Sequence, residues 1–249
     1  MTVDPLHVLL VAALAFLTSI VGGVSGFGAG LLIAPFLVPL VGVKAAVPCV
    51  VIAMIFGNLS RAWVYREHMD LLAVARLLPA IVPGLLIGSS VYRWLTPQEL
   101  SLIVGTVVIA SLPLRRLLAR RTIQPRPLAV ASACFLFGTL AGSAPGGGVV
   151  VISALLGLGF SGPALIATDA AVGLLVTLIN TTAYITYGVL DAERIAIGAA
   201  VGCGMIPGAF AARYLATKLG NKVQVRGIEL FVLASGLYFI HLGLSGSLD

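Results

Sequence analysis

Hydrophobic residues lie along the chain in long runs that short breaks separate. A bilayer is crossed by about 20 consecutive apolar residues in helical form. Ten such runs occur in this sequence, and the shorter ones pair with a neighbour across a glycine-rich break. The pattern predicts an all-α polytopic membrane protein, with apolar runs at 6–22, 27–42, 45–65, 72–93, 99–118, 128–143, 147–160, 163–187, 194–217 and 225–244.

Two of the breaks contain no charged residue, and both are rich in glycine: Gly22–Gly28 and Gly142–Gly148. Glycine allows backbone conformations and close approaches that other residues do not. Irregular backbone within a bilayer is tolerated where it is buried in protein or lines a water-filled cavity. We therefore expect each break to form the tip of a helical hairpin at membrane depth.

The two glycine-rich breaks also mark an internal repeat. They lie 120 residues apart, and later landmarks recur in the same order at offsets of 120 to 124. We predict two repeats, 1–120 and 121–249, each a Gly-tipped hairpin followed by three transmembrane helices, as is typical of secondary transporters. Chance similarity in a chain rich in small apolar residues is the alternative. The matching pairs are Asn58 with Asn180, Asp70 with Asp191, and Pro83-Gly84 with Pro207-Gly208.

Loop charges predict the orientation of the repeats. A hairpin that returns to its own side plus three spans gives an odd number of crossings, so the second repeat is inverted. The arginine-rich segment 115–127 is expected in the cytoplasm by the positive-inside rule. This choice leaves three of the fifteen lysines and arginines outside, namely Lys44, Arg93 and Arg194. Both termini are then expected on the non-cytoplasmic side of the cytoplasmic membrane.

Composition agrees with a membrane location and excludes several classes of function. The chain is 59% hydrophobic and 10% charged, against about 45–50% and about 25% in soluble domains. A soluble enzyme is therefore excluded. The net charge of +6 follows from basic cytoplasmic loops rather than nucleic-acid binding. The spacing of the cysteines does not predict a disulfide framework. The sequence has no cluster of metal ligands and no phosphate-binding loop, so it predicts neither a metal site nor ATP hydrolysis.

The glycine-rich tips are the first candidates for a binding site. Each leads into a helix whose free N–H groups and dipole attract negative charge. Two inverted tips would meet near the centre of the protein and bind a small anion there. Close packing of helices through small residues is the structural alternative. The candidate substrate-binding residues are Gly23, Ser25, Gly26, Gly28, Ser143, Gly146, Gly147 and Gly148.

Polar residues within the spans give further candidates. Asn58, Asn180 and Thr181 carry amide and hydroxyl groups that bind oxyanions, and Arg61 adds a forked positive charge on the Asn58 helix face. For the asparagines the alternative is an interhelical hydrogen bond. For Arg61 the alternative is an interfacial position, with the charge reaching towards the headgroups.

Asp169 is the acidic residue well inside a predicted span. A carboxylate in a bilayer is costly and by default is a functional candidate with a partner. We expect it at the depth of Arg61, in a pair that opens when a proton or an anion arrives. A permanent structural ion pair, or a charge in the first turn of the helix, is the alternative.

A different class of function is an intramembrane serine protease, because Gly23-Val24-Ser25-Gly26 matches the GxSG pattern of such enzymes. A nucleophilic serine needs a neighbouring base, and His241 is the one histidine placed to supply it. The second repeat carries Pro145 at the matching position, so the duplicated feature is the turn and not the hydroxyl. A passive anion channel and a non-transporting membrane subunit are two further hypotheses.

With these features the chain resembles the TauE/SafE family of sulfite and organosulfonate exporters. The resemblance rests on Gly22–Gly28 with Pro35 after it, on Gly142–Gly148 and on the eight-span length, and it covers both repeats. It implies transport of small anions such as sulfite, thiosulfate or sulfoacetate. The sequence departs from the family pattern where Phe27 and Ala29 interrupt the first glycine run and where Pro145 precedes the second.

The sequence therefore predicts a secondary transporter and not an enzyme. It would move a small anion, sulfur-containing or a carboxylate, by alternating access, with the anion bound between the two tips. The expected partners are this anion, a coupled proton or other ion, and the lipid bilayer. No cofactor, metal or nucleic acid is expected, and a homo-oligomer is left open.

Overall fold

A computed structural model of the protein describes residues 5–25, 29–119, 127–144, 148–216 and 221–245. Within these ranges the chain is helical and contains no β-strand, so the all-α architecture predicted from the hydrophobic runs is confirmed. The elements are α1 (Pro5–Ser25), α2 (Ala29–Val64), the 3-10 helix η1 (Arg66–His68), α3 (Leu71–Tyr92), α4 (Pro97–Ala119), α5 (Pro127–Ser143), α6 (Gly148–Gly157), α7 (Gly162–Thr186), α8 (Ala192–Ala216) and α9 (Asn221–Ser245).

Several of these helices are built to cross a membrane. Among the described residues, four helices are both long and apolar enough to do so: α2, α3, α7 and most of α8. The protein's two tryptophans, Trp63 before α3 and Trp94 after it, are exposed, and an arginine lies 4.8 Å from each ring centroid. Tryptophans of this kind sit at membrane interfaces. The 22 residues of α3 span about 33 Å at about 1.5 Å per residue, close to the thickness of a bilayer core.

The predicted break between runs 27–42 and 45–65 is a bend between the two helical parts of α2. Gly42 has φ 75° and ψ 163°, a conformation outside the helical region that glycine adopts readily. The chain folds back there, because Gly30 packs against Val50 and Met54 on the other side of the bend. The two parts of α2 therefore correspond to the predicted second hairpin arm and the following span.

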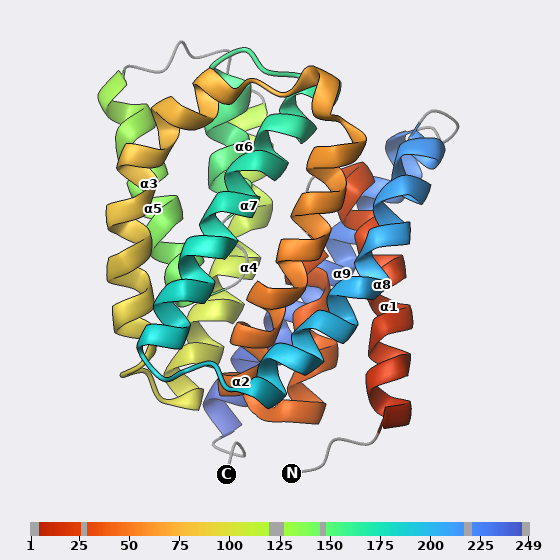
Figure 1. The fold of residues 1–249 in the computed structure, drawn as a ribbon, viewed down its shortest axis with the longest axis vertical. Coiled ribbons are helices and arrows are strands. Elements are labelled where there is room, and N and C mark those ends of the chain that lie inside the picture. Colours follow the sequence, from red (N-terminus) through yellow and green to blue (C-terminus); the bar gives the residue numbers. More distant parts are fainter. Residues whose placement is uncertain (1–4, 26–28, 120–126, 145–147, 217–220, 246–249) are drawn as a thin grey trace.

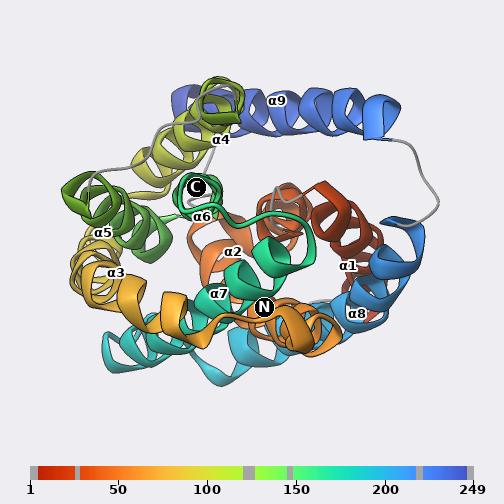
Figure 2. The ribbon, with the colours of Figure 1, turned by 90° about the horizontal axis from the view of Figure 1, so that it is seen from above.

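The helices form a central group with pairs of helices around it. Figure 2 shows α2, α6 and α7 in the interior, with α3 beside α5, α1 beside α8, and α4 beside α9 around them. The outward faces of the outer helices carry exposed leucines, as expected against lipid. The candidates Asn58, Arg61, Asp169, Asn180 and Thr181 lie on the two central helices α2 and α7.

Glycines set the distance between the outer helices. Added Cβ atoms at Gly84 and Gly88 of α3 would overlap backbone oxygens of α5, and one at Gly138 of α5 would overlap the Ile81 oxygen of α3. In a bilayer, such small residues let backbones approach closely enough for dispersion to hold helices together. The contact between α3 and α5 is therefore close helix packing through small residues.

Helices of the two predicted repeats begin at opposite ends of the molecule. Both chain termini are marked at one end, where α1 begins and α9 ends, whereas α5 begins at the opposite end (Figure 1). The first hairpin arm and the fifth helix thus enter the bundle from opposite ends.

Candidate functional site

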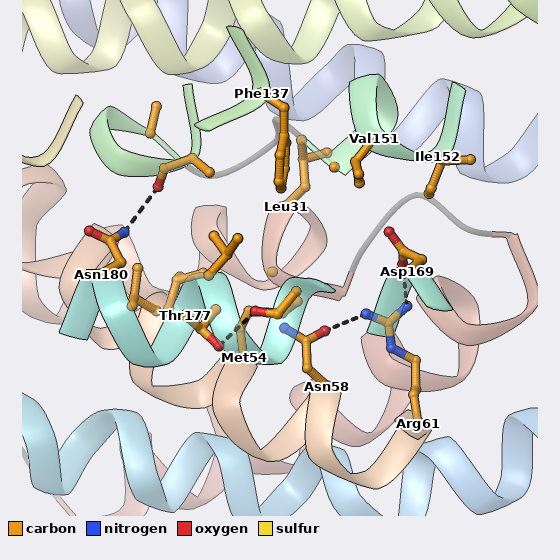
Figure 3. Close-up of a pocket in the computed structure, with 18 residues that line it drawn as sticks. Leu31, Met54, Asn58, Arg61, Phe137, Val151, Ile152, Asp169, Thr177 and Asn180 are labelled. Carbon is orange, nitrogen blue, oxygen red and sulfur yellow. Dashed lines mark hydrogen bonds and ion pairs between the residues drawn. The ribbon is translucent and has the colours of Figure 1, made fainter. Parts of the chain in front are cut away.

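A cavity lies between the two central helices and the hairpin formed by α5 and α6. Its volume is about 110 Å³, which is room for several water molecules or one small oxyanion. Figure 3 shows the lining side chains. Most of the lining is apolar, and the polar or glycine members are Gly30, Asn58, Arg61, Gly148, Asp169, Gly173, Thr177 and Asn180.

Arg61 is the positive charge of this cavity and is 7% exposed. Its Nη2 donates a hydrogen bond of 2.5 Å to Asn58 Oδ1, one helical turn earlier on α2. Its Nη1 lies 3.5 Å from Asp169 Oδ2 on α7. The guanidinium is thus held between an amide and a carboxylate, as Figure 3 shows. The Arg61 side chain is thus buried within the protein, three residues before the end of α2 at Val64.

Asp169 is 8% exposed and is the eighth residue of α7. The influence of a helix dipole falls off within the first turn, so a first-turn charge is not a sufficient explanation for this carboxylate. The structure instead places Asp169 beside Arg61, at the depth that the sequence suggested. A buried charge pair in a membrane helix is costly unless it is well paired, and such a pair inside a cavity marks a functional candidate.

Close contact between α2 and α7 positions these groups. Gly173 of α7 faces Asn58, and a Cβ atom added there would lie 2.9 Å from Asn58 Nδ2. Any larger residue at position 173 would therefore have to displace the Asn58 side chain. Thr177, one turn later, also lines the cavity and donates its hydroxyl hydrogen to the backbone of α7. Sequence reasoning missed both residues, which carry no charge and no repeated landmark.

Asn180 has a different role from Asn58, although the two match in the repeat. Its Nδ2 donates to the Ala141 oxygen at 3.0 Å, and its Oδ1 lies 2.8 Å from the Ser89 hydroxyl of α3. Tyr184, one turn further on α7, donates to the Gly142 oxygen at 2.7 Å. These side chains bind carbonyls in the last turn of α5, which have no partner within their own helix. Asn180 therefore caps the end of α5 within the helical bundle.

Tyr184 allows this capping role to be tested. We expect Tyr184→Phe to lower the stability of the solubilised protein by about 1–3 kcal/mol, because the Gly142 carbonyl would lose its partner in a buried position. Thermal unfolding in detergent measures the change. Tyr187→Phe is the matched control, since the Tyr187 ring lies against Arg93 and a phenylalanine ring keeps that contact. An unchanged midpoint for Tyr184→Phe would contradict the capping role.

The remaining predicted residues divide into three groups. Gly148 begins α6 and lines the cavity, whereas Gly23 packs against Ala212 of α8. Ser143 donates its hydroxyl hydrogen within α5, and the buried Thr181 hydroxyl has no hydrogen-bond partner among the described residues. Neither these two nor Gly23 lines the cavity. The side chain of Ser25 and the residues Gly26, Gly28, Gly146 and Gly147 lie outside what the structure describes.

No group of three or more metal-ligating side chains occurs among the described residues. Comparison with protein families gives a match to the model of the sulfite exporter TauE/SafE family over residues 11–239. No curated protein and no solved structure matches the chain. The matched region contains every residue that lines the cavity.

Proposed function

Because the chain belongs to the sulfite exporter TauE/SafE family, we propose that it carries a small oxyanion across the cytoplasmic membrane through the cavity described above. The observation that carries this proposal is a buried guanidinium, that of Arg61, lining a central cavity. Members of this family are transporters rather than enzymes, and the apolar helices make this chain a multi-pass membrane protein.

Three features of the cavity favour an anion as the bound solute. The Arg61 guanidinium presents several N–H donors in a planar fork, which matches the oxygens of a sulfonate, sulfite or carboxylate group. Asn58 holds that fork in place through its Oδ1. The N-terminus of α6 at Gly148 lines the same cavity, and free N–H groups at a helix start attract negative charge. Binding between both glycine-rich tips extends this proposal to residues beyond the described ranges.

Alternating access would need two closures, one on each side of the bound anion. We place the first at Arg61 and Asp169, towards the end of the molecule where α2 finishes. The second lies around Asn180, where Tyr184 and Tyr92 are fully buried with ring centroids 4.9 Å apart. Each closure contains contacts between different helices, so relative motion of those helices would open one side at a time.

An inverted duplication of 1–120 and 121–249 would provide these two closures. Its support is an exchange of packing partners: α3 of the first repeat packs on α5 of the second, while α8 of the second packs on α1 of the first. The matching glycines Gly84 and Gly208 make the same kind of close contact. A Cβ atom added at Gly84 would overlap the Phe135 oxygen, and one added at Gly208 would overlap the Phe16 oxygen. The opposite starting ends of α1 and α5 (Figure 1) agree with inversion.

The proposed orientation puts the basic segment 115–127 in the cytoplasm and both termini outside. The ends of α4 and α8, which flank the arginine- and lysine-rich connections, lie at the end of the molecule opposite the termini (Figure 1). The positive-inside rule then assigns that end to the cytoplasm. Arg61 and Asp169 would form the cytoplasmic closure.

Flux measurements in proteoliposomes test the proposed function. The purified protein is reconstituted, and uptake of labelled sulfite, thiosulfate, sulfoacetate and acetate is followed with and without a pH gradient. We expect saturable uptake of at least one sulfur oxyanion and mutual inhibition among those that bind. An ohmic, unsaturable current would identify a channel instead, and no flux above that of empty liposomes for any of these anions would refute the proposal.

The substitution Gly148→Leu tests the role of the cavity in transport separately from the stability of the fold. A Cβ atom at Gly148 meets nothing within 4 Å, so the fold has room for a side chain, but an isobutyl group would occupy the anion's space at the start of α6. We expect flux to fall by at least about tenfold while gel-filtration behaviour and thermal unfolding stay those of the wild type. Gly148→Ala serves as the control and should keep most of the flux. Full transport by Gly148→Leu would exclude an anion site at this position.

A further inference from the structure

The two polar contacts of the Arg61 guanidinium differ in length. Arg61 Nη2 lies 2.5 Å from Asn58 Oδ1, but Nη1 lies 3.5 Å from Asp169 Oδ2, well beyond the about 2.7–2.9 Å of a strong charged hydrogen bond. Within the described residues Arg61 is the one ion-pair partner of Asp169. The guanidinium is therefore held by the amide, whereas the carboxylate can leave it without breaking a short bond.

The matching positions of the other predicted repeat carry no ion pair. The offset of 122 residues that matches Asn58 with Asn180 also matches Arg61 with Ala183 and Asp169 with Val47. Both counterparts are buried and apolar. The other repeat thus packs the same helix positions without charge, so structural need alone does not explain why Arg61 and Asp169 are charged.

The charge balance of the cavity limits what can enter it. With Arg61 positive and Asp169 negative, the empty centre is neutral. A monoanion entering alone would leave two negative charges on one guanidinium in a poorly solvated space, which is costly. A proton bound to Asp169 removes one of those charges, so the loaded centre, with Arg61 positive, the anion negative and Asp169 neutral, is again neutral.

We propose that Asp169 is a resident carboxylate that occupies the anion's place on Arg61, and that it gives up this place by taking one proton for each anion that binds. The inference rests on the proposed transport function and adds its coupling. The anion binds Arg61 as the Asp169 carboxylic acid moves away, and release of both restores the Arg61–Asp169 pair. For a monoanion, both the empty and the loaded carrier cross between states without net charge.

Other titratable groups near Asp169 are few. Of the elements packed against α7, α2 brings Arg61 and, beyond it, Tyr65, which faces Arg213 of α8. The described part of α6 has no titratable side chain, and α5 has Cys134, buried in an apolar cluster. The remaining charged groups on this side are exposed: Arg66, Glu67 and His68 of η1, with Asp70 and Arg76 at the start of α3. Asp169 is therefore the acid positioned to exchange a proton with the cavity.

Asp169→Asn tests the coupling because it cannot return the charge that neutralises Arg61. In the wild type, anion uptake should follow an imposed proton gradient and move protons that a pH dye in the lumen detects. In Asp169→Asn we expect gradient-driven uptake to fall at least tenfold, since the empty carrier would have to cross with an unpaired guanidinium. Exchange of internal for external anion should continue, because the carrier then crosses loaded in both directions.

Two further measurements keep the result decisive. Asp169→Glu should retain proton-driven uptake, and it replaces the asparagine variant if that protein does not fold, with gel filtration as the check. Methanesulfonate stays a monoanion across the tested pH range, so proton movement that accompanies its uptake belongs to the protein.

The failures of the two proposals can be told apart. Anion flux in the wild type without proton movement, or proton-driven uptake that persists in Asp169→Asn, would overturn the coupling and leave the transport function in place. Absence of flux for every anion tested would overturn the transport function and the coupling with it. Wild-type proton movement that is lost in Asp169→Asn, with exchange retained, would support both.

Discussion

Arg61→Ala is expected to lower anion flux by roughly 30- to 5,000-fold, the equivalent of about 2–5 kcal/mol for removing one partner of a buried charged contact. The guanidinium is the positive charge in the cavity, and its loss leaves the anion with Asn58 and a helix start as donors. Flux in proteoliposomes at equal protein content measures the effect.

The same substitution should also destabilise the protein, because Asp169 would remain buried without its partner. A double variant separates the two effects. Arg61→Ala with Asp169→Val installs the residues found at the matching positions of the other repeat, Ala183 and Val47. We expect its thermal stability to return to about that of the wild type while flux stays as low as in Arg61→Ala. Transport by the double variant would show that the charged pair does not bind the anion.

Gly138→Leu is expected to prevent accumulation of folded protein in the membrane. A Cβ atom at Gly138 would overlap the Ile81 oxygen, and backbone cannot move aside as a side chain can. Separating α3 from α5 would also remove the contacts of Gly84 and Gly88 with the same helix. Overpacking that forces backbone shifts typically costs about 1–3 kcal/mol and occasionally more.

Fluorescence-detected gel filtration of a tagged protein measures this outcome, with Gly148→Leu as the matched control. Both substitutions add the same side chain to a glycine of the second hairpin, but position 148 has open space. We expect aggregation or degradation for Gly138→Leu and a single symmetric peak for Gly148→Leu. Equal behaviour of the two variants would contradict the proposed close approach of α3 and α5.

Helix positions could be predicted from the sequence because the hydrophobic runs are long and end at charged or glycine-rich breaks. The break between runs 27–42 and 45–65 could also be placed from the sequence, because Gly42 and Lys44 interrupt the apolar stretch there. The structure has a bend at Gly42 between the two helical parts of α2. The inward faces of the helices could not be predicted, because helices that are apolar all round have no polar face to read.

The same physical reason separates the site residues that could be found from those that could not. Arg61 and Asp169 stand out as charges in apolar runs, and the structure brings them to 3.5 Å. Thr177 and Gly173 line the cavity but resemble many other small residues of the chain. Tyr184 takes part in capping α5, a role that depends on the rotation of α7 relative to a helix end 42 residues away in sequence.

Repeat matching also has a limit that Asn58 and Asn180 illustrate. The two residues occupy equivalent positions, yet Asn58 holds the Arg61 guanidinium and Asn180 holds the end of α5. The partner of each amide depends on which helices pack against it. A matching position in the two predicted repeats therefore does not predict the chemistry of the residue there.

The location of the bound anion tests the central claim most directly. Selenite has the shape and charge of sulfite, and selenium gives an anomalous diffraction signal that marks its position. In crystals of the protein soaked with selenite, we predict an anomalous peak in the cavity, within hydrogen-bonding distance of the Arg61 guanidinium and next to Asn58. In crystals of Arg61→Ala with Asp169→Val the peak should be absent. A selenite site elsewhere in the protein, with the cavity empty at concentrations that saturate transport, would contradict the account.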